Sequence, residues 1–238
     1  MWFKSRNIRF VISETRDPVA NLLMEEIILE AVDKGCSIDT LRLWVNDRCL
    51  VMGRGSKGYG WYNEDLATRM GIKIYRRITG GGVVYHDGGN LNWSFYIRHQ
   101  DKNVDIEELF KGPAQIIIKA LHNLNIDAYF VPPNRIEYRG YKISGMAAYV
   151  KRNAVLVHGT LLVSANLEEL NKLCIPPLNS PPVTNLIQWK KDLTVHKIID
   201  VIEITLQHEG FSVIKSNLTS WEDKQVKEKM QNMLDLIH

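Results

Sequence analysis

The chain lacks the features of disulfide-stabilised, membrane and nucleic-acid-binding proteins. It has only three cysteines in 238 residues, without metal-type spacing, and an odd number argues against a disulfide framework. No apolar run approaches the length that spans a bilayer, and residues 1–6 contain no hydrophobic stretch of a signal peptide. A net charge of +3 is too small to indicate nucleic-acid binding. We therefore expect a soluble, cytoplasmic protein with no membrane and no nucleic acid among its partners.

Repeats, low-complexity segments and obvious domain linkers are also absent from the sequence. Hydrophobic residues make up 45% of the chain, which is enough for a buried core, and the length of 238 residues suits one large domain. We therefore expect residues 1–238 to form a single domain.

Hydrophobic periodicity predicts a mixture of helices and strands. One helix begins at Asp17-Pro18, where the aspartate caps it and the proline takes its first position, and it ends at Gly35. The runs 41–45 and 49–52 predict a hairpin, and consecutive hairpins between 135 and 163 predict an antiparallel sheet. Further strands are predicted at 8–12, 71–76, 91–97 and 126–131, and further helices at 63–70, 106–124, 167–174, 195–207 and 221–237.

Local signals refine two of these helices. Asp105 is the predicted cap of the helix at 106–124, and Gly112-Pro113 should break or kink that helix. Ser220 and Asp223 have the spacing of a capping box for the last helix.

The most informative stretch runs from Arg76 to Ser94 and contains five glycines, at 80–82, 88 and 89. Each glycine costs roughly 1 kcal/mol of chain entropy, so three in a row indicate that the backbone closely approaches a ligand. Their N–H groups can point together at an anion. Arg76 and Arg77 face opposite sides of a strand, so at most one should reach this ligand. A plain glycine-rich hairpin is the alternative, and the flanking Arg, His, Asp and Asn residues make it the weaker interpretation.

This stretch resembles the signature loop of the lipoate–protein ligase family, Arg-Arg-x-Ser/Thr-Gly-Gly-Gly-x-Val-x-His-Asp-x-Gly-Asn. Two later segments match the same family in order and spacing, Lys-Ile-Ser-Gly-x-Ala from Lys142 and His-Gly-Thr-Leu-Leu from His158. The segment 183–186 is a weaker match, because the family often has arginine where this chain has Pro182. The resemblance covers most of the chain. It implies the fold shared by biotin and lipoate ligases (class II synthetase-like), which is α/β (α+β) with a mixed, largely antiparallel sheet flanked by helices.

The resemblance also implies a reaction in two steps. Lipoate first attacks the α-phosphate of ATP and gives lipoyl-AMP and pyrophosphate, whose charge Mg²⁺ shields. A lysine of an acceptor protein then attacks lipoyl-AMP and releases AMP. The expected acceptor is a lipoyl domain of the type found in a 2-oxoacid dehydrogenase subunit or in the glycine cleavage H protein.

Lys142 is the expected catalytic residue, because a compact ammonium can touch both the carboxylate and the α-phosphate. The resemblance implies that ATP and the adenylate are bound by Arg77, Gly82, Val83, Val84, Tyr85 and Lys142. It implies that the lipoyl group is bound by Gly81, His86, Lys142, Gly145, Ala147 and His158. Candidate oxygen ligands of Mg²⁺ are Asp87 and Asn90. Candidates for the wall of the acid pocket are Trp44, Tyr85, Met146 and Val157.

The two histidines also have other interpretations. His86 lies beside the glycine loop, where an imidazole could hold the adenylate or help to deprotonate the incoming amine. For His158 a purely structural role is at least as good an interpretation as a ligand contact.

A second glycine-rich segment, Gly53 to Gly58, fits G-x-G-x-x-G, but no helix opens there, so it is weak as a dinucleotide site. It is also similar to the Gly-Arg-Gly-Arg-x-Gly loop of biotin ligases. That loop lies just before a Gly-Asn-Leu strand, whereas about 30 residues separate Gly58 from Asn90 here. Lipoate ligases usually have Gly-Arg-x-Gln at this place, so Ser56 is a departure. A flexible surface turn is an equally good interpretation.

Two other functions stay open. A transferase that uses octanoyl-carrier protein would need a nucleophilic cysteine before the strand at 135–138, and the segment 131–137 has none. Asn134 instead matches the first residue of the ligases' Asn-Asp pair, while Arg135 replaces the acidic partner, which suggests an altered metal or acceptor contact. A non-catalytic scaffold that binds lipoyl-adenylate is the third hypothesis. Residues 1–238 leave no room for the accessory domain of many lipoate ligases, so we expect a separate subunit to supply it.

Overall fold

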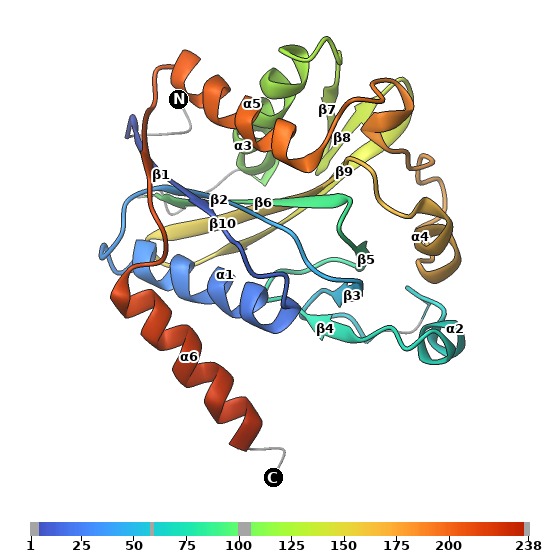
Figure 1. The fold of residues 1–238 in the computed structure, drawn as a ribbon, viewed down its shortest axis with the longest axis horizontal. Coiled ribbons are helices and arrows are strands. Elements are labelled where there is room, and N and C mark those ends of the chain that lie inside the picture. Colours follow the sequence, from blue (N-terminus) through green and yellow to red (C-terminus); the bar gives the residue numbers. More distant parts are fainter. Residues whose placement is uncertain (1–4, 58–59, 100–105, 236–238) are drawn as a thin grey trace.

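The computed structural model describes residues 5–57, 60–99 and 106–235, and these ranges form two β-sheets with helices on both sides (Figure 1). The large sheet has eight strands in the order β11-β1-β2-β6-β10-β9-β8-β7. They are β1 (Asn7–Ile12), β2 (Thr40–Trp44), β6 (Asn90–Arg98), β7 (Tyr129–Val131), β8 (Arg135–Tyr138), β9 (Tyr141–Val150), β10 (Ala154–Leu162) and β11 (Ser212–Lys215). Only β1 makes parallel pairs, with β11 and β2. The predicted mixed, largely antiparallel fold is therefore confirmed.

The small sheet has the order β4-β3-β5 and lies on the same side of the large sheet as the first helix (Figure 1). Its strands are β3 (Cys49–Met52), β4 (Ile74–Arg76) and β5 (Val83–His86). The glycine run is thus the connection from β4 to β5. Residues 83–86, predicted as part of a loop, form a strand because they pair with β3.

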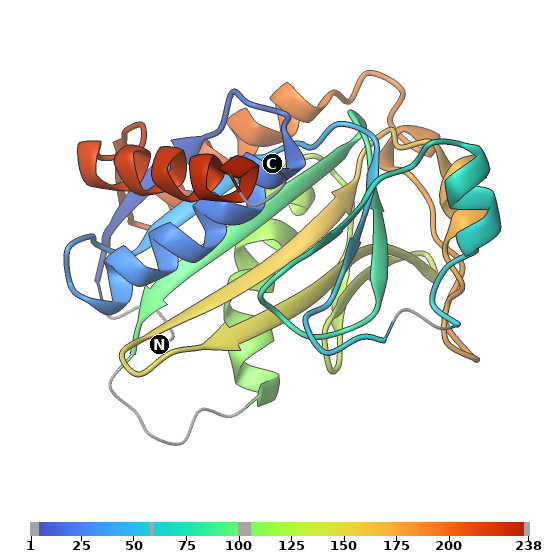
Figure 2. The same ribbon diagram turned by 90° about the horizontal axis from the view of Figure 1, so that it is seen from below.

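Helices cover both faces of the large sheet. Helices α3 and α5 pack on one face, and α1 lies on the other beside α6 (Figures 1 and 2). Helix bounds are α1 (Pro18–Asp33), α2 (Glu64–Arg69), α3 (Ile106–His122), α4 (Leu167–Leu173), α5 (Val195–His208) and α6 (Ser220–Asp235), with a 3₁₀ turn at Leu186–Gln188. No helix in the described ranges is long and apolar enough to cross a bilayer.

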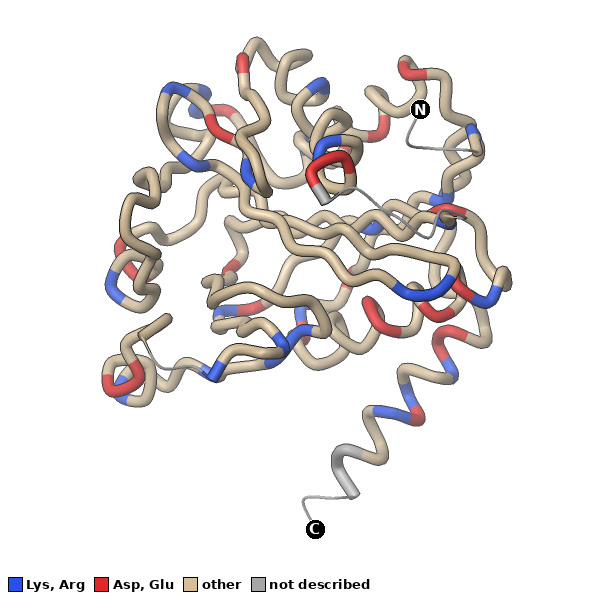
Figure 3. The backbone as a smooth tube through the Cα atoms, turned by 180° about the vertical axis from the view of Figure 1, so that it is seen from behind, with Lys and Arg blue, Asp and Glu red and all other residues tan. Residues whose placement is uncertain are grey.

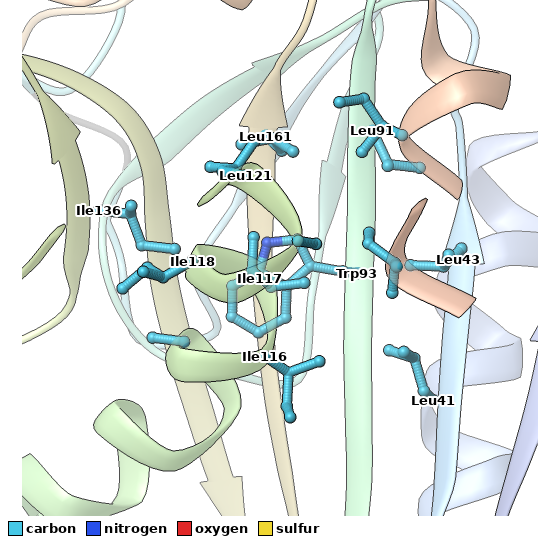
Figure 4. Packing of buried hydrophobic residues seen from close by; sticks show 14 of the residues in the cluster. Leu41, Leu43, Leu91, Trp93, Ile116, Ile117, Ile118, Leu121, Ile136 and Leu161 are labelled. Atoms are coloured by element: carbon cyan, nitrogen blue, oxygen red, sulfur yellow. The ribbon is translucent and has the colours of Figure 1, made fainter. Parts of the chain in front are cut away.

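The main core lies between the large sheet and α3. Figure 4 shows Trp93 of β6 at its centre, with Ile117 of α3 close to its indole ring. Both side chains are fully buried, and burying one large apolar side chain contributes about 1.5–3 kcal/mol. Gly159 on β10 makes room for the indole, because a Cβ there would lie 2.4 Å from Trp93 Cζ2. This core fixes β6, β10 and β9 as a platform whose opposite face is left for the site.

The predicted hairpin at 41–45 and 49–52 is wrong, because β2 joins the large sheet and β3 joins the small one. The reason lies in Asn46, which is fully buried and accepts a hydrogen bond from Asn21 Nδ2 at 2.9 Å. Its own Nδ2 lies 3.1 Å from His86 Nδ1. Residues 45–48 therefore form a crossing between two sheets that is anchored by the buried Asn46, rather than a hairpin turn.

Two helix predictions also need correction. Helix α3 continues through Gly112-Pro113 without a break, because Leu109, Ala114 and Ile117 are buried on its core face and hold the turns together. The predicted cap of this helix, Asp105, lies outside the described residues.

The capping box of α6 begins one residue earlier than predicted. The Thr219 and Glu222 side chains and backbone N–H groups bond reciprocally at 2.8 and 3.2 Å. Glu222 is fully buried, and both its carboxylate oxygens accept hydrogen bonds from Arg9 on β1 at 2.8 Å. This buried ion pair selects Glu222 over the exposed Asp223 and attaches the start of α6 to the sheet.

Candidate active site

The glycine-rich signature loop is held by the second glycine-rich segment, which follows β3. Gly53 N–H donates to Gly82 O at 3.1 Å, and Arg54 N–H donates to Thr79 O at 2.8 Å. A Cβ at Gly53 would lie only 2.2 Å from Gly81 O, so this approach of two backbones needs glycine. The structure therefore favours a structural role in the site over a free surface turn for this segment.

A pocket of about 530 Å³ opens between the two glycine-rich segments. Its lining residues are Gly55, Ser56, Lys57, Trp61, Gly80 and Gly81. Trp61 packs against Gly82, where a Cβ would lie 2.5 Å from the indole. The pocket walls are thus largely backbone, with an aromatic ring and a lysine, which suits a planar anionic ligand.

Arg77 braces the signature loop from inside. Its Nη2 donates to Gly80 O at 2.8 Å and to Gly82 O at 3.1 Å, and its Nη1 donates to Val51 O at 3.0 Å. Burial lowers the pKa of Arg77 to about 10, so the guanidinium still carries its charge at neutral pH. Arg76 points away and binds Ser56 O at 2.9 Å, as the strand alternation predicts. Arg77 therefore shapes the loop, and its direct contact with phosphate stays a prediction.

A chain of buried hydrogen bonds connects this loop to helix α1. Arg77 can only donate and an ionised carboxylate can only accept, which fixes the direction of the chain. Arg77 Nε donates to Thr79 Oγ1 at 2.9 Å, and Thr79 Oγ1 lies 2.8 Å from His158 Nε2. His158 Nδ1 lies 2.8 Å from Glu25 Oε1 and so carries the proton toward it. In the neutral imidazole, Nε2 then accepts from the Thr79 hydroxyl.

Glu25 ends this chain, and the sequence analysis missed it. The Ser94 hydroxyl also donates to Glu25 Oε1, at 2.7 Å, and in turn accepts from Trp44 Nε1 at 2.9 Å. Burial alone would raise the pKa of Glu25, but the charge and hydrogen bond of His158, with Ser94 and Arg42, hold it below its ordinary value of 4.5. A glutamate on the apolar face of the first helix, three residues after Leu22, was the signal that could have revealed it.

Lys142 lies on β9, on the face of the sheet that carries His158. The β10–β9 register pairs His158 with Ala147, and a Cβ at Gly145 would lie 3.0 Å from Lys142 Nζ. Gly145 therefore leaves space for the lysine side chain to fold back along its strand. Burial, and next the charge of Arg135, lower the pKa of Lys142 below its ordinary value of 10.5. Among the described residues, the Lys142 ammonium forms no ion pair.

The segment after Pro182 braces the start of β9 at Lys142. Lys142 N–H donates to Pro182 O at 2.9 Å, and Thr184 N–H donates to Lys142 O at 3.3 Å. Asn185 exchanges two hydrogen bonds with the backbone of Ala165, at 2.7 and 3.0 Å. The weak family match at 183–186 thus holds the backbone of Lys142, which gives this segment a physical role.

Residues 17–207 match the Lipoyl protein ligase A/B catalytic domain family. The chain belongs to this family. Lipoate–protein ligase 1 of Staphylococcus aureus is 33% identical over 162 residues, 68% of this chain and 48% of that protein. Lipoate–protein ligase A of Blochmanniella pennsylvanica is 31% identical over 220 residues, 87% of this chain and 63% of that protein. The chain thus spans about half to just under two thirds of the length of these relatives.

Solved structures of lipoate ligases share the fold. A bi-partite lipoate protein ligase from Thermoplasma acidophilum aligns with a TM-score of 0.84 at 24% identity, covering 93% of this chain and 91% of that chain. A lipoate–protein ligase A bound with ATP aligns with a TM-score of 0.84 at 24% identity, covering 93% of each chain. At 24% sequence identity, this structural similarity shows a shared fold and nothing further.

The ligase family resemblance offered Asp87 and Asn90 as ligands of Mg²⁺, and their contacts do not favour this. Asp87 Oδ1 accepts from Gly89 N–H at 2.8 Å and Oδ2 accepts from Asn166 N–H at 2.7 Å, so the carboxylate attaches the start of α4. Asn90 is fully buried, with its Nδ2 bonded to Asn92 at 3.1 Å. Within the described ranges no group of three His, Cys, Asp or Glu residues could hold a metal ion. We assign no protein ligand to the metal.

The candidate lipoyl-binding histidine His86 suits a donor role rather than proton transfer. Asn46 donates to its Nδ1, so Nε2 carries the ring proton. Burial, and next the charge of Arg77, lower the pKa of His86 to about 3. Its Nε2 is buried without a partner among the described residues. An imidazole with so low a pKa is too weak a base to deprotonate an amine.

The predicted pocket wall is partly wrong. Trp44 lies on the side of the site, because its ring packs edge-on against His86 with centroids 5.9 Å apart. Met146 and Val157 belong to the core cluster beneath α3. They are the sequence neighbours of Ala147 and His158, and successive strand residues point to opposite faces. Tyr85 is 3% exposed, and its hydroxyl donates to Glu169 at 2.8 Å. Its ring is therefore buried between β5 and α4.

The remaining ligase site residues lie on the edge of the small sheet. Val83 and Val84 are half-buried on β5, which pairs only with β3 among the described strands. Every second backbone N–H of such an edge strand points away from the sheet. These groups and Gly82 are available to a ligand, and their contact with the adenylate stays a prediction.

Replacing Glu25 by Gln should lower the free energy of unfolding at pH 7 by about 1–3 kcal/mol, because a buried acceptor of charged hydrogen bonds is lost. The lowered pKa of Glu25 means that its contribution is present above pH 4.5 and is lost as the pH falls through the lower folded value. Urea unfolding at several pH values measures both effects. Glu26→Gln is the control, because Glu26 is partly exposed and forms an ion pair with Lys229 at 3.2 Å on the surface of α1. Equal stability of the two variants at every pH would contradict the role of Glu25.

Proposed function

We propose that this protein is an ATP-dependent lipoate–protein ligase, which forms lipoyl-AMP and transfers the lipoyl group to a lysine of an acceptor protein. The observation that carries the proposal is Lys142. Its half-buried side chain lies on the face of His158, and among the described residues its ammonium forms no ion pair. Burial lowers the pKa of Lys142, which shows that the site disfavours a cation without an anionic partner.

The chemistry of the first step needs such a cation. The carboxylate of lipoate and the α-phosphate of ATP are both anions and repel each other. Lys142 touches both and stabilises the charge that develops as the carboxylate oxygen bonds to phosphorus and pyrophosphate leaves. N–H groups of the signature loop support the phosphate without adding charge. Mg²⁺ bound to ATP would supply further positive charge for the pyrophosphate, and we assign no residue of this chain to it.

The second step breaks the acyl–phosphate bond. A neutral lysine amine of the acceptor attacks the acyl carbon, an amide forms, AMP leaves and one proton is released. The proposed acceptor is a lipoyl domain of a 2-oxoacid dehydrogenase or a glycine cleavage H protein. The Thermoplasma acidophilum ligase of the same fold was studied with an E2 lipoyl domain, which supports this choice.

We propose further that efficient formation of lipoyl-AMP needs a separate accessory subunit. We also propose that the protein acts in the cytoplasm. The same Thermoplasma ligase is bi-partite, which supports a division of the activity between two chains. A closed site would keep water from the adenylate.

A transferase mechanism is the second candidate, and two of the three cysteines, Cys49 and Cys174, speak against it. Such a mechanism needs a thiolate nucleophile. Burial raises the pKa of Cys49 to about 12, and burial likewise raises the pKa of Cys174 to about 12. Both thiols therefore stay protonated at neutral pH.

The test measures both half-reactions on the purified chain, with and without a candidate accessory subunit. Lipoate-dependent ATP–pyrophosphate exchange reports activation, and mass spectrometry of a lipoyl domain incubated with synthetic lipoyl-AMP reports transfer. We expect transfer by the chain alone and strong exchange after the partner is added. Full exchange without a partner would remove the accessory subunit from the proposal. Absence of both activities under all conditions would contradict the ligase itself.

A further inference from the structure

A second cation, Arg135 on β8, stands beside the proposed catalytic lysine. The β8–β9 register pairs Arg135 with Gly145 and Glu137 with Lys142. Gly145 is the residue over which the Lys142 side chain folds, since a Cβ there would lie 2.9 Å from Lys142 Cε and 3.0 Å from Nζ. Arg135 and Lys142 thus lie on neighbouring strands, and Glu137 stands opposite Lys142 and binds Arg135.

The guanidinium of Arg135 is only partly used by the protein. Its Nε donates to Glu137 Oε1 at 2.5 Å, and its side chain is 33% exposed. Among the described residues, Nη1 and Nη2 have no hydrogen-bond partner. A guanidinium presents five N–H donors in a planar fork. Four of the five donors therefore have no acceptor among the described residues.

The local charges do not balance. Arg135 and Lys142 bring two positive charges, and Glu137 brings one negative charge that is shared with Arg135. Elsewhere in the chain lysines, arginines, aspartates and glutamates are interspersed, as Figure 3 shows along α6. The mutual repulsion of the two cations is visible in the pKa of Lys142, which burial lowers first and Arg135 lowers next. An anion between them would relieve both effects.

We infer that Arg135 is a phosphate-binding residue, whose free Nη groups grip phosphate oxygens of the nucleotide while Lys142 holds the oxygen next to the reacting carboxylate. That the nucleotide is ATP rests on the proposed function. A fork-shaped cation suits phosphate, because two parallel N–H groups reach two oxygens at once. The neighbouring Glu137 fixes the fork by its Nε and leaves the outer edge open.

This assignment also explains the departure of this chain from the Asn-Asp pair of its family. An aspartate at position 135 would offer an oxygen ligand to a cation. A guanidinium at the same place repels a cation and supplies positive charge to the phosphates directly. Asn134 keeps the local backbone in place, since its Nδ2 donates to Met146 O at 2.7 Å.

The experiment measures binding of inorganic pyrophosphate and of ATP by calorimetry at a fixed MgCl₂ concentration, with Arg135→Gln and Arg135→Lys. The Gln variant should weaken both ligands by about 10- to 100-fold, the range expected for lost charged hydrogen bonds. The Lys variant should recover part of the affinity. Arg139→Gln is the matched control, because Arg139 is exposed at the turn of the same hairpin and stacks only on Tyr138. It should bind both ligands like the wild type.

A double variant separates direct binding from an indirect effect. In Arg135→Gln alone, Glu137 is free to pair with Lys142 and neutralise it. Arg135→Gln with Glu137→Gln removes that pairing. Affinity that stays low in the double variant supports a direct contact, and affinity restored to the wild-type value overturns it. A change in the KM for lipoate alone would overturn it as well.

Failure of the proposed function would look different. It would appear as wild-type protein without lipoate-dependent exchange, whatever residue stands at 135. Failure of this inference would appear as an active wild type and an Arg135→Gln variant with unchanged pyrophosphate and ATP affinity. Circular dichroism and the unfolding midpoint of each variant confirm that the affinities refer to folded protein.

Discussion

Replacing Lys142 by methionine should abolish adenylate formation and should also make the unliganded protein more stable. The ammonium is expected to stabilise the charge that develops between carboxylate and α-phosphate, and loss of one such group typically costs about 100- to 1000-fold in rate. Lys142→Arg should fail as well, because a planar fork cannot replace a compact ammonium between two oxygens. ATP–pyrophosphate exchange measures the loss.

The gain in stability follows from the pKa of Lys142, which burial and Arg135 lower below 10.5. A cationic group whose folded pKa is lowered opposes folding below that pKa, and this penalty disappears as the pH rises toward 10.5. The wild type should therefore gain stability at alkaline pH, whereas Lys142→Met should be more stable at pH 7 and lose that alkaline gain. Denaturant unfolding at pH 7 and pH 9–10 measures this.

Lys73→Met provides the control for both measurements, because Lys73 is exposed at the approach to β4. It should change neither the exchange rate nor the pH dependence of unfolding. Near-normal exchange by Lys142→Met would remove Lys142 from the mechanism. A Lys142→Met protein that is less stable than the wild type at pH 7 would show that the lysine is compensated inside the apoprotein.

Sequence patterns were sufficient to predict helices and strands whose stabilising contacts lie close by in the sequence. The helix after Asp17 begins where predicted, because its cap accepts hydrogen bonds from two N–H groups of its own first turn. The hairpins from Arg135 to Leu162 also form as predicted, since each strand pairs with its neighbour in sequence. Regular spacing alone would place Lys142 and His158 on opposite faces, because His158 pairs with Ala147, five residues after Lys142. The register shift between β8 and β9 at Ile136 and Glu137 brings Lys142 to the face of His158. The strands were therefore predictable from a short stretch of chain, whereas the common face was not.

Other features depend on contacts between distant residues, and no local pattern encodes them. Strand β11 was not predicted, because its half-exposed residues become a strand only by pairing with β1, some 200 positions earlier. Glu25 was overlooked, because its role depends on the hydrogen bond with His158, which lies 133 residues away in the sequence. The helix cap at Thr219 depends on Arg9 in the same way. For Glu25 and for Glu222, a buried carboxylate binds a residue that is distant in the sequence.

The second glycine-rich segment illustrates both sides of this distinction. Its G-x-G-x-x-G pattern was visible, but it was weak as a dinucleotide site, its position did not match the biotin-ligase loop, and a surface turn explained it equally well. The structure shows that Gly53 and Gly55 differ completely in their surroundings. Gly53 touches the backbone of the signature loop, while a Cβ at Gly55 would have nothing within 4 Å. Two glycines that are equivalent in the pattern thus differ in whether they have room for a side chain.

Gly53→Ala should therefore disable the nucleotide pocket, whereas Gly55→Ala should leave it intact. A Cβ at position 53 would lie 2.2 Å from Gly81 O and 2.8 Å from Gly80 C, both of them backbone atoms that cannot turn aside. The signature loop must then move, and a displacement of about 1 Å at a reacting centre can cost about 100-fold in rate. Overpacking of this kind also costs about 1–3 kcal/mol of stability.

The comparison of the two variants measures the effect of steric overlap without backbone strain. Neither glycine lies in the left-handed region that an alanine would avoid. Circular dichroism first establishes that both variants are folded. ATP binding and pyrophosphate exchange then measure the pocket, and Gly53→Ala should fall about 100-fold below Gly55→Ala in exchange. If the two variants exchange at the same rate, the second segment does not position the signature loop, and the hydrogen bonds from Gly53 and Arg54 serve the fold alone. If Gly55→Ala is the more damaged variant, the ligand itself passes over Gly55, within the open side of the pocket.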